Sequence, residues 1–311
     1  MTRKTLSVCI GLALTALAAS ALAADTLAVV ATTPDLGAIA RAVGGDRVEV
    51  TSIARPTEDP HFVDARPSFV RTLNKADVLV EGGAYLEAGW LPPLVDGARN
   101  SKIAAGAPGR IVASQGIALR DVPTSLDRSM GDVHPLGNPH YLLDPVNAKT
   151  AAGTIAAGLC AVDAAGCDLY REGAQRFAAA IDAKLPQWQS ALAAVKGAKV
   201  VTYHKNFDYL ADRFGLVVFD NLEPKPGIPP SPTHIAELVP RMQAAGVKLI
   251  LVEPNREQQT PEFVADKTGA RVVPLPLMPG GEEASDYVAL IDYDVKQIAA
   301  AAKATGAPGA R

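Results

Sequence analysis

Two histidines of the chain stand in matching local contexts. His61 lies in EDPHFVDARP and His140 in GNPHYLLDP, so each follows a proline, precedes an aromatic residue and has an acid and a second proline further on. Proline fixes its own φ and lacks a backbone donor, so neither segment suits a helix interior. We therefore expect both rings to be held on constrained loops, which suits a metal ligand as well as a packed side chain.

A third histidine follows an apolar run that is typical of a strand. His204 comes directly after KVVTY, and a helical pattern begins at FDYLADRFG. In open α/β sheets the carboxyl ends of the strands line the ligand crevice. Three neutral imidazoles with an open fourth position suit Zn²⁺. His61, His140 and His204 are therefore candidate metal ligands, although a structural role is an equal alternative on spacing alone.

The two remaining histidines give weaker signals. His134 lies in GDVHPLGNPH, where we expect an exposed loop residue, with an accessory site that passes metal inward as the alternative. His234 falls in the first turn of a predicted helix behind the N-cap residue Ser231, where a polar surface residue is normal. We therefore assign neither of them as a ligand.

The composition indicates an ordinary soluble α/β protein. With 311 residues, of which 48% are hydrophobic, the chain is long enough for two compact domains. A formal net charge of −3 leaves no basic footprint for nucleic acid, so we exclude a nucleic-acid partner.

The first residues carry the pattern of a secretory signal peptide. A basic start, MTRK, precedes an apolar stretch over 6–19 and the small-residue run Ala21–Ala23. The apolar stretch is too short to span a bilayer stably. We expect residues 1–23 to be cleaved and the mature chain to begin near Ala24, free in an exported compartment. Cys9 lies inside the apolar stretch, which is the wrong setting for a lipid-attachment cysteine.

Two cysteines remain after such cleavage. Cys160 and Cys167 lie in GLCAVDAAGCDLY. An even pair of cysteines in an oxidising compartment predicts a disulfide, here one that closes a small loop at the end of a helix. Two free thiols are the alternative, whereas a soft-metal site would need further ligands nearby.

The mature chain alternates between short apolar runs and helical patterns. Strands are predicted over 26–33, 47–54, 78–83, 110–114, 199–203, 216–222, 247–253 and 271–277. Helices are predicted over 34–45, 67–77, 145–160, 168–196, 207–215, 231–246, 260–269 and 285–303, with a broken helical segment over 85–98 and a surface loop over 115–138. This alternation favours an α/β fold of two Rossmann-like lobes with mostly parallel sheets, joined by one long connecting helix. We place the first lobe at 24–167, the linker helix at 168–196 and the second lobe at 197–311.

Four segments resemble the zinc/manganese substrate-binding proteins of ABC transporters, the cluster A-I metal-binding proteins. In chain order they are ARPTEDPHFVDARPSFVRTLNKADVLVEGGAYLEAGWL, GNPHYLLDPVNAKTAAGTIAAGL, VVTYHKNFDYLADRFGL and LILVEPNREQQTPEFVADKTGARVV. The resemblance implies two α/β lobes joined by one long helix, with metal held between them by His61, His140 and His204. It also implies a periplasmic location and a membrane ABC permease as partner. We expect a monomer, and whether a periplasmic metallochaperone loads the metal stays open.

The chain departs from that family at the fourth ligand. Members often supply an aspartate shortly after the last strand, but RVVPLPLMPGGEEASDYVALI has no carboxylate between Arg271 and Glu282. Glu253, at the end of LILVE, is a candidate for orienting a histidine through a hydrogen bond. The candidates for the fourth position are a water molecule and five acids: Glu58, Asp59, Glu282, Glu283 and Asp286.

The ligand types favour zinc. Mn²⁺ prefers oxygen ligands and higher coordination, whereas a set dominated by imidazole favours Zn²⁺ and would also bind copper tightly. We therefore predict high-affinity binding of zinc, with manganese less favoured, between the lobes and its delivery to the permease for uptake.

Two other function classes stay open. A zinc-dependent hydrolase would use the three-histidine site with a bound water, but the sequence contains neither a His-Glu-x-x-His helix nor a Gly-x-Ser-x-Gly elbow. A metal-free adhesin or partner-binding module would leave the histidines as bystanders, so that metal removal would not change thermal stability.

Overall fold

Two four-stranded parallel sheets form the frame of the molecule, and they have the same strand order. The computed structural model describes residues 26–125, 131 and 134–307, so the signal peptide predicted over 1–23 lies outside the described residues. The first sheet has the order β2-β1-β3-β4, with β1 Leu27–Ala31, β2 Val48–Ser52, β3 Val78–Glu81 and β4 Arg110–Val112. The second has the order β6-β5-β7-β8, with β5 Lys199–Thr202, β6 Val217–Asn221, β7 Leu249–Val252 and β8 Arg271–Pro274. The predicted fold class of two α/β lobes is therefore confirmed.

The central strands are mostly apolar, as expected for strands covered by helices on both faces. β3 and β7 are buried along their whole length, and β7 is the uninterrupted run LILV. All strand pairs are parallel. The segments that follow the strands of one sheet therefore lie at one edge, which is where a ligand site of an open sheet forms.

Helices cover both sheets. The first lobe contains α1 Pro34–Gly44, α2 Pro67–Lys75, α3 Leu91–Ala98 and α4 Pro145–Val162. The second contains α6 Asp208–Phe214, α7 Pro232–Ala245, α8 Gln259–Thr268 and α9 Tyr287–Thr305. Several begin with proline, which suits the first helical position because its missing N–H would be unpaired there anyway. The N-cap role predicted for Ser231 is confirmed, since its hydroxyl accepts the His234 N–H at 3.3 Å.

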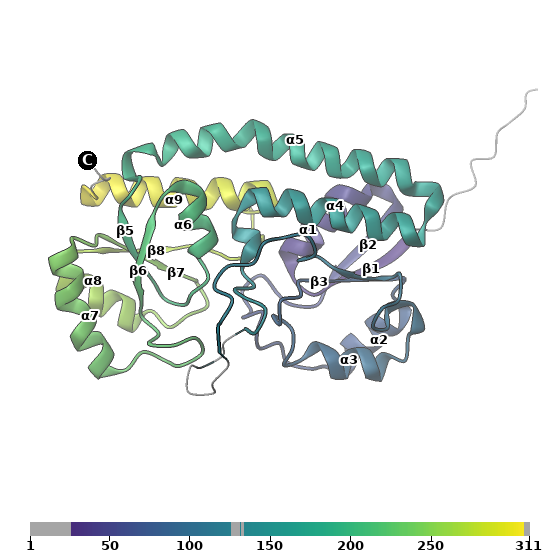
Figure 1. Cartoon of the computed structure of the whole chain (residues 1–311), viewed down its shortest axis with the longest axis horizontal. Coiled ribbons are helices and arrows are strands. Elements are labelled where there is room, and N and C mark those ends of the chain that lie inside the picture. Colours follow the sequence, from purple (N-terminus) through teal and green to yellow (C-terminus); the bar gives the residue numbers. More distant parts are fainter. Residues whose placement is uncertain (1–25, 126–130, 132–133, 308–311) are drawn as a thin grey trace, which may run out of the picture.

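One long helix connects the lobes. α5 Cys167–Ala191 runs from the first lobe to the second, and α9 packs beside it (Figure 1). Asp292 of α9 accepts hydrogen bonds from Lys184 Nζ and Trp188 Nε1 of α5, both at 3.1 Å. The helix predicted over 168–196 ends at Ala191 and continues as a short 3-10 turn, Ala193–Val195.

The largest of three apolar clusters among the described residues continues from one lobe to the other. It includes Val29 of β1, Phe177 and Trp188 of α5, and Val200 of β5. Tyr287 of α9 packs against Phe177 with ring centroids 5.6 Å apart. Because separating the lobes would expose this shared core, we expect small movements between them rather than a wide hinge.

A disulfide closes the junction between α4 and α5. Cys160 and Cys167 form the predicted bond across a sequence separation of 7 residues. Asp163, in the turn between them, accepts hydrogen bonds from Tyr170 at 2.7 Å and from Arg47 at 2.6 Å. The start of the connecting helix is thereby tied to the first lobe.

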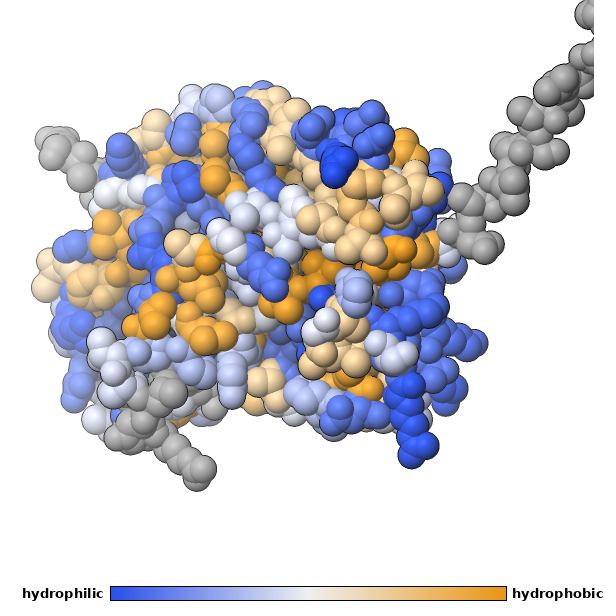
Figure 2. Space-filling model, turned by 45° about the vertical axis from the view of Figure 1, so that its right-hand side comes forward, coloured by the Kyte–Doolittle hydropathy of each residue, from blue (hydrophilic) through white to orange (hydrophobic). Residues whose placement is uncertain are grey.

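The described residues contain no helix that is long and apolar enough to cross a bilayer. On the face drawn in Figure 2, hydrophilic residues are interspersed with smaller apolar patches. Phe62 and Tyr85 are among the exposed large apolar side chains, and they come from the loops that follow β2 and β3. The loop after β2 also carries His61, one of the histidines described next.

Candidate metal centre

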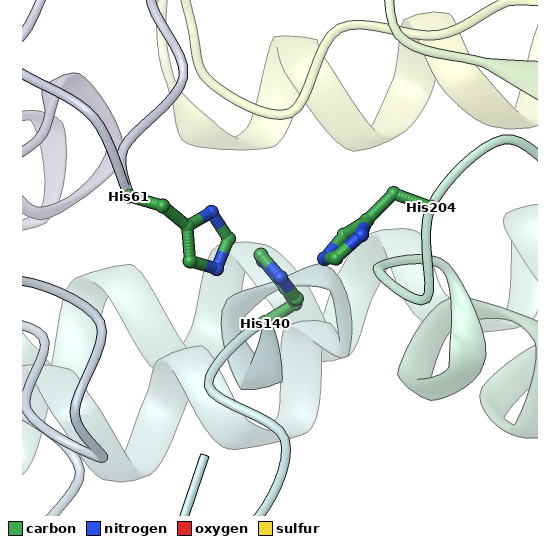
Figure 3. Close-up of side chains that lie close together, drawn as sticks. All are labelled: His61, His140 and His204. Atoms are coloured by element: carbon green, nitrogen blue, oxygen red, sulfur yellow. The ribbon is translucent and has the colours of Figure 1, made fainter. Parts of the chain in front are cut away.

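Three histidines from both lobes meet at one point. His61 comes from the loop after β2, His140 from the turn before α4, and His204 from the loop after β5 (Figure 3). Their ligand nitrogens all lie within 4.8 Å of one another. The ring centroids are 5.0 Å apart for His61–His140, and 5.4 Å apart for both His61–His204 and His140–His204. The structure thus brings together the three residues that the sequence marked as candidates.

His140 is held by contacts that cross from the first lobe to the second. Its backbone N–H donates to Asn138 Oδ1 at 3.0 Å, while Asn138 Nδ2 donates to the carbonyl of Lys205 at 2.9 Å. Tyr209 of α6 donates its hydroxyl to the carbonyl of Asn138 at 2.8 Å. Gly137 has φ 111°, which favours glycine, and a Cβ there would also clash with neighbouring backbone. The loop between the two prolines is therefore as constrained as the sequence predicted.

The ring of His140 is buried and keeps a free nitrogen. Nε2 has no hydrogen-bond partner among the described residues. Burial is the main cause that lowers the pKa of His140 well below its usual value, and the neighbouring histidines lower it further. A buried polar atom without a partner costs about 1–3 kcal/mol. A neutral ring with an unshared electron pair in such a place fits a metal ligand.

The other two histidines are each oriented by a carboxylate. His204 Nδ1 lies 2.7 Å from Glu223 Oε2, and His61 Nδ1 lies 2.8 Å from Asp59 Oδ1. Because the carboxylates accept, Nδ1 is the donor in both rings, which leaves Nε2 as the atom that a metal can bind. Carboxylates in this position fix the tautomer and raise the basicity of zinc-binding histidines.

Arg256, in the loop after β7, joins these two carboxylates. Its Nη2 lies 3.2 Å from Asp59 Oδ2 across the cleft, its Nη1 3.7 Å from Glu223 Oε1 and its Nε 3.2 Å from Glu253 Oε1. Burial alone would lower the pKa of Arg256, but the three carboxylates raise it above its usual value. Burial would raise the pKa of Asp59, but the hydrogen bond from His61 and the charge of Arg256 hold it well below its usual range. Both side chains are therefore charged.

His134 lies against the site, so the expectation of an exposed loop residue is wrong. The residue is half-buried, and its Nε2 lies 3.1 Å from His61 Nε2. Burial, followed by the charges of neighbouring histidines, lowers the pKa of His134 to about 4. The physical reason is that the end of this loop is held in place: the Asn138 N–H donates to the carbonyl of Arg120 at 2.7 Å, and the Gly137 N–H donates to that of His134 at 3.1 Å.

The five acids considered for the fourth position either form hydrogen bonds elsewhere or are exposed. Asp59 is bonded to a site histidine, and Asp286 caps α9 by accepting a backbone N–H at 2.8 Å. Glu58 accepts a backbone N–H of its own loop at 3.1 Å. Glu282 and Glu283 are exposed. Among the described residues, no carboxylate shares the 4.8 Å cluster of the three histidines.

Glu253 and His234 lie outside the histidine cluster. Glu253 contacts Arg256 rather than a histidine, and its second oxygen is buried without a partner among the described residues. His234 donates from Nε2 to the carbonyl of Asn221 at 2.9 Å and lies outside the cluster. Glu223 and Arg256 were missed, although both follow predicted strands and the strand-end rule that marked His204 could have found them.

The fold and this histidine centre define a class of two-lobed metal-binding proteins. A family model described as zinc-uptake complex component A, periplasmic, matches residues 29–301. The chain belongs to this family, whose members are periplasmic metal-binding components of ABC transporters.

Relatives of this chain carry names for different metals. A putative metal-binding protein of Treponema pallidum (strain Nichols) is 27% identical over 286 residues, which cover 88% of this chain and 86% of that protein. The manganese ABC transporter substrate-binding lipoprotein PsaA of Streptococcus anginosus is 22% identical and covers 88% of each chain. The crystal structure of ZnuA has a TM-score of 0.75 at 23% identity, with 89% of this chain and 99% of that chain covered. At this identity the structural likeness supports the two-lobed fold.

Proposed function

We propose that this protein binds zinc with high affinity between its lobes and delivers it to a membrane ABC permease for uptake. The observation that carries the proposal is the convergence of His61, His140 and His204 from both lobes, with ligand nitrogens within 4.8 Å. The buried Nε2 of His140 supports it, because this atom has no partner among the described residues and an ion at this point would supply one.

Zinc is preferred over manganese in this proposal because of the donor atoms. All three converging side chains offer nitrogen, and the nearby acids Asp59 and Glu223 are turned toward histidines and Arg256. Mn²⁺ favours oxygen ligands, whereas imidazole suits Zn²⁺. Copper would also bind such a set, so the preference concerns zinc against manganese.

The site supports binding rather than turnover. A hydrolase would need a general base free to take a proton from a metal-bound water. Asp59 and Glu223, the carboxylates in contact with the histidines, each already accept a hydrogen bond from a ring and pair with Arg256. Family members act as transport proteins, which agrees with capture and release of a cargo ion.

The proposal places the mature chain in the periplasm as a monomer. Cleavage of residues 1–23 would free the chain, with lobes at 24–167 and 197–311 and a linker at 168–196. The family supports a membrane permease as the partner. A metallochaperone as the source of the zinc is compatible with the position of the histidines at a cavity that His134, His140 and His204 line together.

The test is a calorimetric titration of the metal-stripped mature protein with Zn²⁺ and, in parallel, Mn²⁺. We expect one tight zinc site, weaker manganese binding, and a large loss of zinc affinity in His61→Ala, His140→Ala and His204→Ala. His234→Ala is the matched control and should bind like the parent. Parental zinc affinity in all three site variants would overturn the proposal, and tighter manganese than zinc binding would overturn the metal preference.

A further inference from the structure

His134 stands beside the three converging histidines as a fourth imidazole. Its ring centroid lies 5.1 Å from that of His61, a spacing like those among the three candidate ligands. It lines one cavity together with His140 and His204. Two nitrogens bound to one tetrahedral zinc ion at about 2.0–2.1 Å lie roughly 3.3 Å apart. The observed 3.1 Å between the Nε2 atoms of His61 and His134 is close to that spacing.

The Nε2 atoms of His61 and His134 face each other at hydrogen-bond distance. His61 Nδ1 donates to Asp59, so its Nε2 carries no proton in the neutral ring. A hydrogen bond with the Tyr85 backbone holds the ring of His134, and its Nε2 lies at hydrogen-bond distance from that of His61. Metal binding displaces protons from its ligands, so a cation between these two nitrogens would take the place of the proton that they share.

The backbone that holds the ring of His134 has an unusual conformation. Gly83, Ala84 and Tyr85 are consecutive residues with φ of 72°, 52° and 71°. Left-handed φ at residues other than glycine costs energy and persists where the surrounding structure enforces it. Here the carboxylate of Glu87 accepts the N–H of Gly82 at 2.6 Å and that of Gly83 at 3.1 Å. This turn therefore positions the backbone of Tyr85, with which His134 makes its hydrogen bond.

We infer that His134 is the fourth ligand of the bound ion, in place of the carboxylate that this chain lacks between Arg271 and Glu282. This inference rests on the proposed function. Four nitrogen donors would strengthen the preference for Zn²⁺ over Mn²⁺. The nitrogen of His134 is not within the 4.8 Å shared by the other three, so its ring must come closer to them to bind the same ion.

The experiment compares His134→Gln with the control His234→Gln in the full mature chain. Zinc affinity is measured by calorimetry with a competing chelator, and Co²⁺ is used as a visible probe of coordination. We expect His134→Gln to weaken zinc binding at least about 10-fold, the smallest loss typical of an outer-shell partner. The intense visible absorption of tetrahedral Co²⁺ should fall in this variant and stay parental in the control.

A second variant, His134→Cys, gives a signature that a purely structural role would not produce. The two other cysteines of the mature chain form the disulfide, so the new thiol would be the free one. A thiolate bound to Co²⁺ adds a charge-transfer band in the near ultraviolet, and we expect this band in His134→Cys. Its appearance would place position 134 on the ion even if His134→Gln were unstable.

The outcomes separate this inference from the proposed function. Parental zinc affinity and Co²⁺ spectrum in His134→Gln, with no thiolate band in His134→Cys, would overturn the role of His134 while His204→Ala still abolished binding. Parental binding in His61→Ala, His140→Ala and His204→Ala would instead overturn the metal site as a whole.

Discussion

The two halves of the histidine centre are held in different ways. In the anchored half, residues 137–144 and 202–205, neutral hydrogen bonds join Asn138 to Lys205 and Tyr209, and the Asp144–Arg213 pair, at 2.7 Å, also crosses between the lobes. In the bridged half, residues 55–62 and Arg256, the polar link across the cleft is an ion pair at 3.2 Å. Part-exposed ion pairs weaken with salt, whereas hydrogen bonds between neutral groups, which the anchored half has in addition to its ion pair, change little. We therefore expect the bridged half to be the part that adjusts when metal enters or leaves.

This asymmetry arises although the two sheets have the same topology. β1 and β5 occupy equivalent places in the two orders, as do β2 and β6. His204 follows β5, but His61 follows β2, and the segment after β1 is the start of α1. Equivalent strands thus supply a ligand in one lobe and a helix start in the other. The shared strand order places the carboxyl ends of the strands where ligands can bind, and the sequence of each loop determines which strand end carries one.

The largest expected effect compares ligands of the two halves. His204→Ala should reduce zinc affinity more than about 100-fold, beyond the range for outer-shell partners. His61→Ala should lose less, because His61 belongs to the bridged half, which we expect to adjust around the ion. Competition calorimetry measures both. A larger loss in His61→Ala than in His204→Ala would contradict the comparison.

The next effect concerns the carboxylates that orient the rings. Asp59→Asn and Glu223→Gln should each weaken zinc binding by about 10–100-fold. Asp59→Asn should cause the larger loss of zinc affinity, because it also removes the ion pair that reaches Arg256 across the cleft. Its affinity should also depend less on salt than that of the parent. Equal losses with equal salt dependence would show that the two halves do not differ.

A smaller effect on affinity is expected from loosening the anchored half. Asn138→Ala removes the hydrogen bonds to the His140 N–H and the Lys205 carbonyl, so the free energy of unfolding should fall by about 1–3 kcal/mol. Asn138→Asp keeps the acceptor for His140 and loses the donor to Lys205. Its free energy of unfolding should therefore lie between those of the parent and Asn138→Ala. Urea denaturation of the metal-free protein measures both. Unchanged stability in Asn138→Ala would show that this half is not anchored by Asn138.

The smallest effect on zinc affinity is expected for Asp294 of α9, which belongs to neither half. Neither of its oxygens has a hydrogen-bond partner among the described residues, and burial raises its pKa well above its usual value. A raised pKa means that stability is full below the unfolded value of 3.8 and falls as the pH rises above it. Asp294→Leu should add about 1–3 kcal/mol to the free energy of unfolding at pH 7, with zinc affinity unchanged.

The control for this last prediction is the pH itself. The gain should shrink as the pH approaches 3.8, where the carboxyl of the unfolded chain is also protonated. Denaturation of parent and variant at several pH values follows it. A gain that is the same at all pH values would assign it to packing rather than to the buried acid.

Most of the fold could be predicted because its signals are local. The run LILV predicted β7, and prolines at helix starts marked α1 and α7. The convergence of His61, His140 and His204 was predictable from strand ends and from the family resemblance. The contacts of Arg256 with Asp59, and of Asn138 with Lys205, were not, because they depend on how the lobes pack together. His134 was misplaced for the same reason, since a polar loop sequence does not tell which way the loop folds.

The group around Arg256 also sets an electrical condition on the cargo. In formal charges, Asp59, Glu223 and Glu253 contribute three negative charges and Arg256 one positive charge. Imidazoles that bind an ion are neutral ligands, so these four side chains carry the charge that one doubly charged ion neutralises. A monovalent ion would leave this poorly hydrated region charged, and a trivalent ion would overcompensate it. Charge balance thus adds a selection for valence to the selection for donor atoms.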